Sequence, residues 1–388
     1  MFVQTMTMEE ILIVGVCKEK AKDEARVALT PEGTQKLISL GLQVHIESGA
    51  GLLSSYTDGD YSAAGASIEN DRQTVLSKSN LLLAVQAPDE TTINLLKPNT
   101  LLVSFIWPLQ NKVYVDLLIK QKITALAMDT IPRISRAQSM DALSSMSNIA
   151  GYKAALMGAH KLDKYLPMMM TAAGTIPPAK VLVLGAGVAG LQAIATAKRL
   201  GAVVEAFDIR PVVKEQVESL GAKFVEVPIE EEEETESKGG YAKELSERNK
   251  EKQREVVHEH VKKSDIVITT ALIPGRPAPR LISKEMVDDM KPGSVIVDIA
   301  AEQGGNCEVT KPGETYNHKG VFVMGPLNIP STLAFHASKL YSKNILSLLS
   351  LLIKDGEANL DFDDEIIANA TVTHMGEIIS PFVKENSK

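Results

Sequence analysis

Near the middle of the chain, residues 180–190 read Lys-Val-Leu-Val-Leu-Gly-Ala-Gly-Val-Ala-Gly. An apolar run followed by G-x-G-x-x-G and a helical pattern is typical of a strand, a turn and a helix that bind a dinucleotide. Gly185 permits the tight turn, Gly187 lets the backbone approach a pyrophosphate, and Gly190 lets the helix pack on the strand. The helix N-terminus offers unpaired N–H groups to phosphate. We therefore expect the cofactor to contact Gly185, Gly187, Val188, Ala189 and Gly190.

The next apolar run, residues 203–207, ends at Asp208. An acidic residue about 20 residues beyond the glycines accepts hydrogen bonds from the adenosine ribose and repels the 2′-phosphate of NADP. Arg210 is the one opposing signal, because an arginine there can hold that phosphate. The carboxylate favours NAD(H), bound by Asp208, Ile209 and Arg210. A helix N-cap is the alternative role for Asp208, and it is compatible with the same site.

Short apolar runs alternate with amphipathic segments along most of the chain. This alternation predicts an α/β protein with two Rossmann-like, doubly wound parallel-sheet domains and a cleft between them. The expected strands lie at residues 11–16, 44–47, 81–85, 101–105 and 123–128, then 180–185, 203–207, 224–227, 266–271, 295–298 and 321–324. A helix expected at 141–166 would cross from one domain to the other, and a helix expected at 331–353 would return to the first domain. The first domain is thus predicted to be discontinuous, 1–140 plus 331–388, around a nucleotide-binding domain at 141–330.

Two loops follow the carboxyl ends of predicted strands in the second domain, where open α/β sheets bind ligands. We expect Thr270, Ala271, Leu272 and Glu302 in these loops to line the cofactor site, although each loop could be an ordinary turn. Residues 228–264, which precede these two loops in the sequence, interrupt the alternation of apolar and amphipathic segments. They include five consecutive glutamates at 230–234. This insertion is either a solvated surface segment or a mobile loop at about 228–255, hinged at Gly240 with Tyr241 near its tip.

Composition narrows the protein class. The 388 residues carry 41 Lys and Arg against 49 Asp and Glu, a net charge of −8, which argues against nonspecific nucleic-acid binding. No apolar run reaches the roughly 20 residues that span a bilayer, and the N-terminus lacks the basic start of a signal peptide. The two cysteines, Cys17 and Cys307, have no metal-ligand spacing and favour a reducing compartment. We expect no metal site.

Two further stretches carry a family resemblance. Residues 26–31, Arg-Val-Ala-Leu-Thr-Pro, resemble the opening of the alanine dehydrogenase and transhydrogenase superfamily. Residues 132–141, Pro-Arg-Ile-Ser-Arg-Ala-Gln-Ser-Met-Asp, resemble the signature of the NAD(H)-binding components of proton-translocating NAD(P) transhydrogenases. Residues 271–275 and 304–306 extend the match, which runs from about 13 to 362.

The resemblance separates two chemistries. Alanine dehydrogenases use a lysine and an arginine for the substrate carboxylate, and a histidine and an aspartate for acid–base work. This chain keeps Arg26, but the lysine position aligns with Ala84, the histidine with Phe105 and the aspartate with Glu302. Deamination needs a proton shuttle, whereas hydride exchange between two nicotinamides needs only their orientation. The resemblance therefore implies transhydrogenation, with an amino-acid dehydrogenase or a silent, regulatory NAD-binding module as alternatives.

The resemblance also implies roles and partners. Arg133, Gln138, Asp141 and Ser144 would surround the nicotinamide of NAD(H), and Gln138 would reach toward NADP(H) on a partner subunit. An Arg133–Asp141 ion pair that fixes the interdomain connection is the alternative, and both roles are compatible. Tyr241 would close over the bound cofactor. The implied assembly is a homodimer peripheral to the cytoplasmic side of a membrane, or in a matrix-like compartment, with separate NADP(H)-binding and membrane-spanning, proton-translocating subunits.

Overall fold

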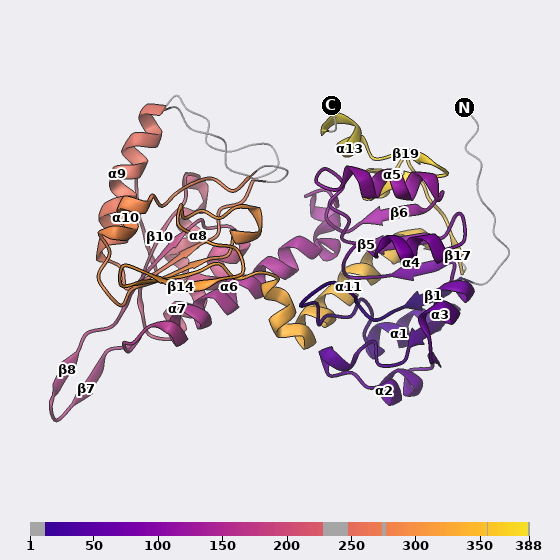
Figure 1. Cartoon of the computed structure of the whole chain (residues 1–388), viewed down its shortest axis with the longest axis horizontal. Helices are drawn as coiled ribbons and strands as arrows, with labels where there is room; N and C mark the ends of the chain where they lie inside the picture. Colours follow the sequence, from indigo (N-terminus) through magenta and orange to yellow (C-terminus); the bar gives the residue numbers. More distant parts are fainter. Residues whose placement is uncertain (1–11, 228–246, 274–276, 355, 387–388) are drawn as a thin grey trace. The chain divides into compact units, whose positions relative to one another are not determined.

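The computed structural model describes residues 12–227, 247–273, 277–354 and 356–386 (Figure 1). The chain divides into two compact units, unit 1 (Met1–Met146 with Pro330–Lys388) and unit 2 (Ser147–Ile329). Helix α6 (Ala142–Lys161) begins in unit 1 and continues into unit 2, and it ends five residues before the predicted helix does. Each unit contains one large sheet with helices packed on it, so the predicted α/β class is confirmed.

Unit 1 is built on an eight-stranded sheet in the order β19-β18-β6-β5-β4-β1-β2-β3. Its strands are β1 (Ile13–Val16), β2 (Gln43–Glu47), β3 (Ser67–Glu69), β4 (Leu81–Leu83), β5 (Leu101–Ser104), β6 (Thr124–Ala127), β18 (Thr371–His374) and β19 (Glu377–Ile378). The first six run parallel, whereas β18 pairs antiparallel with β6 and β19 antiparallel with β18. The five predicted strands are present, and β3, β18 and β19 were not predicted.

Helices cover this sheet because its central strands are apolar on both faces. Every residue of β4 and β6 is buried, as expected for parallel strands between two helix layers. The helices of unit 1 are α1 (Pro31–Ser39), η1 (Leu52–Ser54), α2 (Asp58–Ala63), α3 (Arg72–Lys78), α4 (Glu90–Leu95), α5 (Lys112–Lys120), η2 (Ser135–Met140), η5 (Ile329–Leu333), α11 (Ala334–Leu352), α12 (Glu365–Ala370) and α13 (Pro381–Asn386). A two-stranded ribbon, β16 (Ile353–Lys354) with β17 (Glu357–Ala358), follows α11.

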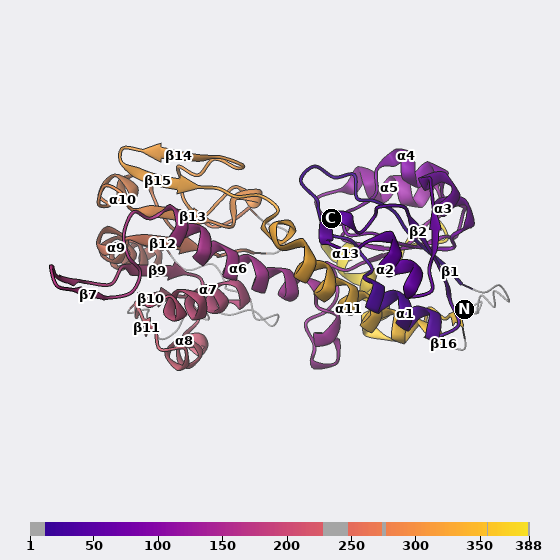
Figure 2. The ribbon, with the colours of Figure 1, turned by 90° about the horizontal axis from the view of Figure 1, so that it is seen from below.

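The N-terminus of α1 matches its sequence signals. The Thr30 side chain accepts a hydrogen bond from the Gly33 backbone, and Pro31 occupies the first turn. Helix α11 packs beside α1 (Figure 2), and a Cβ atom at Gly33 would lie 2.4 Å from the Ser342 hydroxyl. This close approach ties the returning C-terminal segment to the first helix of the chain.

The loop after β5 is held by the carboxylate that follows β6. Asp129 accepts hydrogen bonds from the backbone N–H groups of Ile106 and Trp107, at 2.7 and 2.9 Å. The Trp107 ring stacks on Phe105 at 5.8 Å between centroids, and its backbone has a φ of 53°. Burial raises the pKa of Asp129 from 3.8 to about 6, although the two N–H bonds oppose this shift. The carboxylate and the only tryptophan of the chain are thus directly linked.

Acidification should therefore change Trp107 fluorescence with a midpoint near pH 6. Protonation converts one Asp129 oxygen into a hydroxyl, which is a weaker acceptor, so one of the two N–H bonds is weakened below that pH. Because folding raises this pKa, the group's contribution to stability is present below pH 3.8 and is lost as the pH rises through about 6. The measurement is tryptophan emission between pH 5 and about 7.5. An Asp129→Asn variant should show no change of tryptophan emission over this pH range. If the variant kept the emission change with the same midpoint, Asp129 would not be the titrating group.

Unit 2 is built on a seven-stranded sheet in the order β11-β10-β9-β12-β13-β15-β14. Its strands are β9 (Lys180–Leu184), β10 (Val203–Phe207), β11 (Lys223–Phe224), β12 (Ile266–Thr269), β13 (Val295–Asp298), β14 (Thr315–His318) and β15 (Val321–Met324). All pairs are parallel except β14 with β15. Five of the six predicted strands are present, and β11 shares only Phe224 with the sixth, which was expected at 224–227. Strand β14 and a separate hairpin, β7 (Met169–Thr171) with β8 (Gly174–Ile176), were not predicted.

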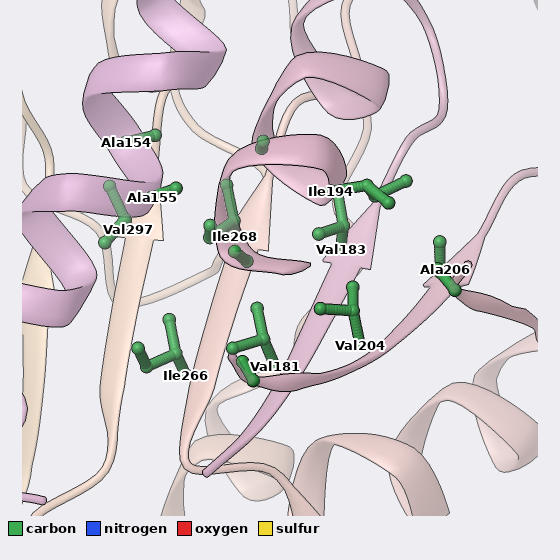
Figure 3. Close-up of a cluster of buried hydrophobic side chains, with 14 of the residues drawn as sticks. Ala154, Ala155, Val181, Val183, Ile194, Val204, Ala206, Ile266, Ile268 and Val297 are labelled. Atoms are coloured by element: carbon green, nitrogen blue, oxygen red, sulfur yellow. The ribbon is translucent and has the colours of Figure 1, made fainter. Parts of the chain in front are cut away.

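Helices on both faces enclose the core of unit 2. They are α7 (Val188–Arg199), η3 (Pro211–Val213), α8 (Lys214–Ser219), α9 (Glu247–Lys263), α10 (Lys284–Asp288) and η4 (Ala301–Gln303), together with most of α6. Figure 3 shows Ala154 and Ala155 of α6 and Ile194 of α7 packed over side chains of β9, β10, β12 and β13. A second cluster on the other face includes Val257 and Val261 of α9. The loops that follow β9, β10, β12 and β13 therefore start from strands that are packed between two hydrophobic clusters.

Candidate functional site

The glycine-rich turn lies between β9 and α7 in unit 2. Gly185 has a φ of 100°, a left-handed conformation that favours glycine, and its N–H donates to the Phe207 carbonyl at 2.8 Å. Gly187 is the N-cap of α7, and no side chain caps this helix. The 12-residue helix therefore offers uncapped backbone N–H groups to an anion.

Glycines at two positions of this turn serve different purposes. A Cβ atom at Gly190 would lie 1.9 Å from the Gly185 carbonyl oxygen, so only glycine permits this approach of helix and turn. A Cβ atom at Gly187 would meet nothing within 4 Å. Space above Gly187 and the uncapped helix N-terminus both fit a dinucleotide diphosphate, so the residues present suit the predicted cofactor.

Asp208 follows β10 and contacts the glycine-rich turn directly. Its carboxylate accepts the Ala186 N–H at 2.7 Å and binds the Arg210 guanidinium through Nε and Nη2, at 2.9 and 2.8 Å. The Arg210 backbone N–H donates to the same carboxylate at 2.9 Å. Ile209 is partly buried and packs against the hydrophobic cluster that includes Phe207. The structure thus brings Asp208, Arg210 and the turn together, and it does not use Asp208 as a helix cap.

The loop after β12 lies against the other side of the turn. The Thr270 hydroxyl donates to the Gly185 carbonyl at 3.2 Å. Ala271 is bonded through both its backbone groups to the side-chain amide of Asn306, with N–H to Oδ1 at 3.0 Å and Nδ2 to the carbonyl at 2.8 Å. The Leu272 side chain is exposed. Thr270, Ala271 and the turn are therefore adjacent, and Asn306 fixes their loop.

A buried carboxylate supports this loop from the next strand. Asp298, fully buried, accepts hydrogen bonds from the Thr269 hydroxyl, the Cys307 N–H and the Thr310 hydroxyl. The sequence pattern placed Asp298 at the end of a predicted strand and Asn306 in the segment 304–306 that carries the resemblance, but it indicated no role for either side chain. The signal available in the sequence was a polar residue at the end of an apolar strand or shortly after it. Glu302 is exposed on η4, and its carboxylate accepts the Asn328 backbone N–H.

Two predicted cofactor contacts, Gly240 and Tyr241, lie outside the described residues, as do residues 230–234. The predicted closing role of that segment therefore stays a prediction. Among the residues that are described, no group of His, Cys, Asp and Glu side chains could hold a metal ion. Cys17 and Cys307 are free thiols.

The segment 132–144 lies in unit 1, where η2 leads into α6. Ala137 and Met140 are buried, and Arg133 and Gln138 are exposed. The segment is held at two points on the C-terminal part of the chain. The Arg136 guanidinium binds the Asp364 carboxylate at 2.6 and 2.9 Å, and the Asn344 amide donates to the Ser139 carbonyl at 2.9 Å. Gln138 is thus presented to solvent from an anchored turn.

Asp141 has a local structural role in this segment. Its carboxylate accepts the Ser144 backbone N–H at 2.8 Å and the Ser144 hydroxyl at 2.5 Å, at the first turn of α6. The two predicted site residues are therefore bonded to each other. Such side-chain bonds satisfy orphan N–H groups at a helix start.

Unit 1 has side chains that cannot transfer a proton at the two positions that align with the lysine and the histidine of alanine dehydrogenases. Ala84 and Phe105 are buried, and the Phe105 ring packs between those of Trp107 and Tyr341. Arg26 is also buried, and its guanidinium binds the Glu24 carboxylate at 2.8 and 2.6 Å. Neither the Ala84 nor the Phe105 side chain can accept or donate a proton.

Family models cover most of the chain. Residues 15–150 match the N-terminal domain of alanine dehydrogenase/PNT, and residues 154–381 match its C-terminal domain. The chain belongs to the alanine dehydrogenase/PNT family. In the described residues of this family member, no helix is both long and apolar enough to cross a membrane.

Within the alanine dehydrogenase/PNT family, the chain is similar to members of both branches. It is 49% identical over 375 residues to an NAD(P) transhydrogenase alpha-subunit chain of Rhodospirillum rubrum, covering 95% of this chain and 98% of that one. The structure of a transhydrogenase from Sinorhizobium meliloti matches with a TM-score of 0.86 and 44% identity, over 95% of this chain and all of that chain. Alanine dehydrogenase of Methanococcus maripaludis is 32% identical, over 83% of this chain and 82% of that enzyme.

Proposed function

We propose that the chain is the NAD(H)-binding subunit of a proton-translocating, Re/Si-specific NAD(P) transhydrogenase. Unit 2 would bind NAD(H) at the turn formed by Gly185, Gly187 and Gly190. Two observations carry the proposal: unit 2 contains this uncapped turn, and in unit 1 the side chains of Ala84 and Phe105 supply no acid or base. Similarity to the Rhodospirillum rubrum subunit supports the same assignment.

The proposed chemistry fits what these residues can do. Bound NADH supplies a hydride, and NADP⁺ held on a partner subunit accepts it. Because no proton is exchanged at the reacting carbons, the chain need only bind, orient and exclude water. Asp208, Ile209, Arg210, Thr270, Ala271, Leu272 and Glu302 would line the cofactor site, with Gly240 and Tyr241 closing it. Arg133, Gln138, Asp141 and Ser144 would orient the nicotinamide.

Partners follow from the same proposal. NADP(H) would be held on a separate subunit, and proton translocation would belong to a membrane-spanning one. The chain would act as a homodimer peripheral to the cytoplasmic side of that membrane. The discontinuous domain at 1–140 with 331–388 would carry the nicotinamide-orienting segment, and the domain at 141–330 would carry the NAD(H)-binding turn.

A reconstitution assay tests the proposal. The purified chain is mixed with a transhydrogenase NADP(H)-binding component, NADPH and an NAD⁺ analogue whose reduced form absorbs at a distinct wavelength. Reduction of the analogue should require both proteins and should proceed without added amino acid. A chain that binds NADH but transfers no hydride at saturating cofactor would overturn it. Reduction of NAD⁺ by alanine with the chain alone would instead favour an amino-acid dehydrogenase, which the retained Arg26 permits.

A further inference from the structure

Asp208 and Arg210 form a largely buried ion pair beside the glycine-rich turn. The side chains are 6% and 14% exposed, so both charges are largely removed from water. The guanidinium binds both carboxylate oxygens, which is the strong, bidentate arrangement. The pair also contacts the glycine-rich turn, because Asp208 accepts the Ala186 N–H.

The hydrogen-bonding capacity of Asp208 is already used. A carboxylate has about four lone-pair sites. Asp208 accepts from the Ala186 N–H and Arg210 Nη2 at one oxygen, and from the Arg210 N–H and Nε at the other. The carboxylate therefore acts first on Arg210, and any further donor has to share with or displace the guanidinium.

Arg210 is the group in this site that suits a phosphate monoester. A guanidinium is always charged and matches phosphate with two parallel N–H bonds. Removing one partner of a buried pair leaves the other charge uncompensated, which is costly. An Arg210 without Asp208 would therefore favour an anion of matching geometry.

We propose that Arg210 is a specificity-determining residue and that Asp208 selects NAD(H) by keeping this arginine neutralised. Loss of the Asp208 carboxylate then converts Arg210 into a binding group for the 2′-phosphate of NADP(H). This inference rests on the proposed NAD(H) site in unit 2. It assigns the coenzyme preference to two residues acting on each other rather than to repulsion by Asp208 alone.

Coenzyme titrations of purified variants test the proposal, with binding of NADH and NADPH measured by calorimetry. Asp208→Ala should bind NADPH roughly 10- to 100-fold more tightly than the wild type, as expected for a charge-assisted bidentate contact. The gain should weaken with added salt. Asp208→Ala/Arg210→Ala should lose it, and so should Asp208→Ala/Arg210→Lys in large part, because lysine lacks the planar fork.

Two further variants keep the test decisive. Asp208→Asn retains an oxygen for the Ala186 N–H but removes the charge, so it should gain NADPH affinity even if Asp208→Ala folds poorly. Asp265→Asn is the matched control, since Asp265 likewise accepts a backbone N–H, from Lys180, and pairs with Lys164 at the opposite end of β9. It should leave both affinities unchanged.

The outcomes separate this inference from the proposed function. A wild-type chain that fails to bind NADH would contradict the proposed function itself. A wild type that binds NADH, with folded Asp208 variants that gain no NADPH affinity, would overturn only the role of Arg210. A gain that persists in Asp208→Ala/Arg210→Ala would also overturn it, because another cation would then hold the phosphate.

Discussion

Replacing Gly190 with alanine is expected to lower the free energy of unfolding of unit 2 by about 3 kcal/mol, the upper range for overpacking a rigid site. The new methyl group would lie 1.9 Å from the Gly185 carbonyl oxygen and 2.8 Å from its carbon. Both are backbone atoms, so no side chain can rotate away, and α7 must move off the turn. NADH binding should be lost with it. Denaturant unfolding and NADH titration are the measurements.

Gly187→Ala provides a control within the same turn. The φ and ψ of Gly187, −75° and −167°, are accessible to alanine, and its Cβ would meet nothing within 4 Å. Stability should be unchanged or raised by up to about 1 kcal/mol, because alanine restricts the unfolded chain. NADH affinity should nevertheless fall roughly tenfold or more, since the methyl group fills the space a diphosphate needs. Equal destabilisation by both substitutions would contradict this division of roles.

Shortening Gln138 to asparagine is expected to slow hydride transfer by one to two orders of magnitude in the reconstituted system. The substitution withdraws the amide by roughly one C–C bond length, about 1.5 Å. A displacement of about 1 Å in a positioning group can cost 10²-fold in rate. Because the Gln138 side chain is exposed, stability should change by less than about 0.5 kcal/mol.

The Gln138 measurement needs three readouts. The transfer rate should fall. The NADH affinity should stay within about twofold of the wild-type value, and the unfolding midpoint should be unchanged within error. Ser135→Ala, at an exposed position of the same η2 helix, should leave the rate unchanged. A wild-type rate for Gln138→Asn, or an equal loss for Ser135→Ala, would remove Gln138 from the transfer site.

Much of the fold was predictable because its inner strands are short, mostly apolar runs. Strands β10, β13 and β15 coincide with the predicted apolar runs to the residue. The antiparallel strands at the sheet edges were missed because their signal is weak. Strand β14 reads Thr-Tyr-Asn-His and alternates between exposed and half-buried residues. Local apolarity identifies a central strand, whereas an edge strand depends on the neighbour it finds.

The candidate site divides in the same way. The glycine-rich turn was predictable because its requirements lie within eleven consecutive residues. The Asn306 clamp was not, since its amide bonds to Ala271, 35 positions earlier in the chain. The Asp208–Arg210 pairing was also missed, although the residues are two apart, because a sequence does not show that their side chains face each other rather than a ligand.

The return of the chain to unit 1 has a consequence for how the protein is made. A ribosome synthesises the whole of residues 147–329 before it reaches α11 and β18. Unit 2 can therefore complete its sheet on the nascent chain, while in unit 1 the outer edge of β6 still lacks its partner and α1 lacks its neighbour. An unpaired strand edge invites pairing with other chains. Synthesis thus begins with unit 1, but unit 2 is the first of the two units to have all of its strands.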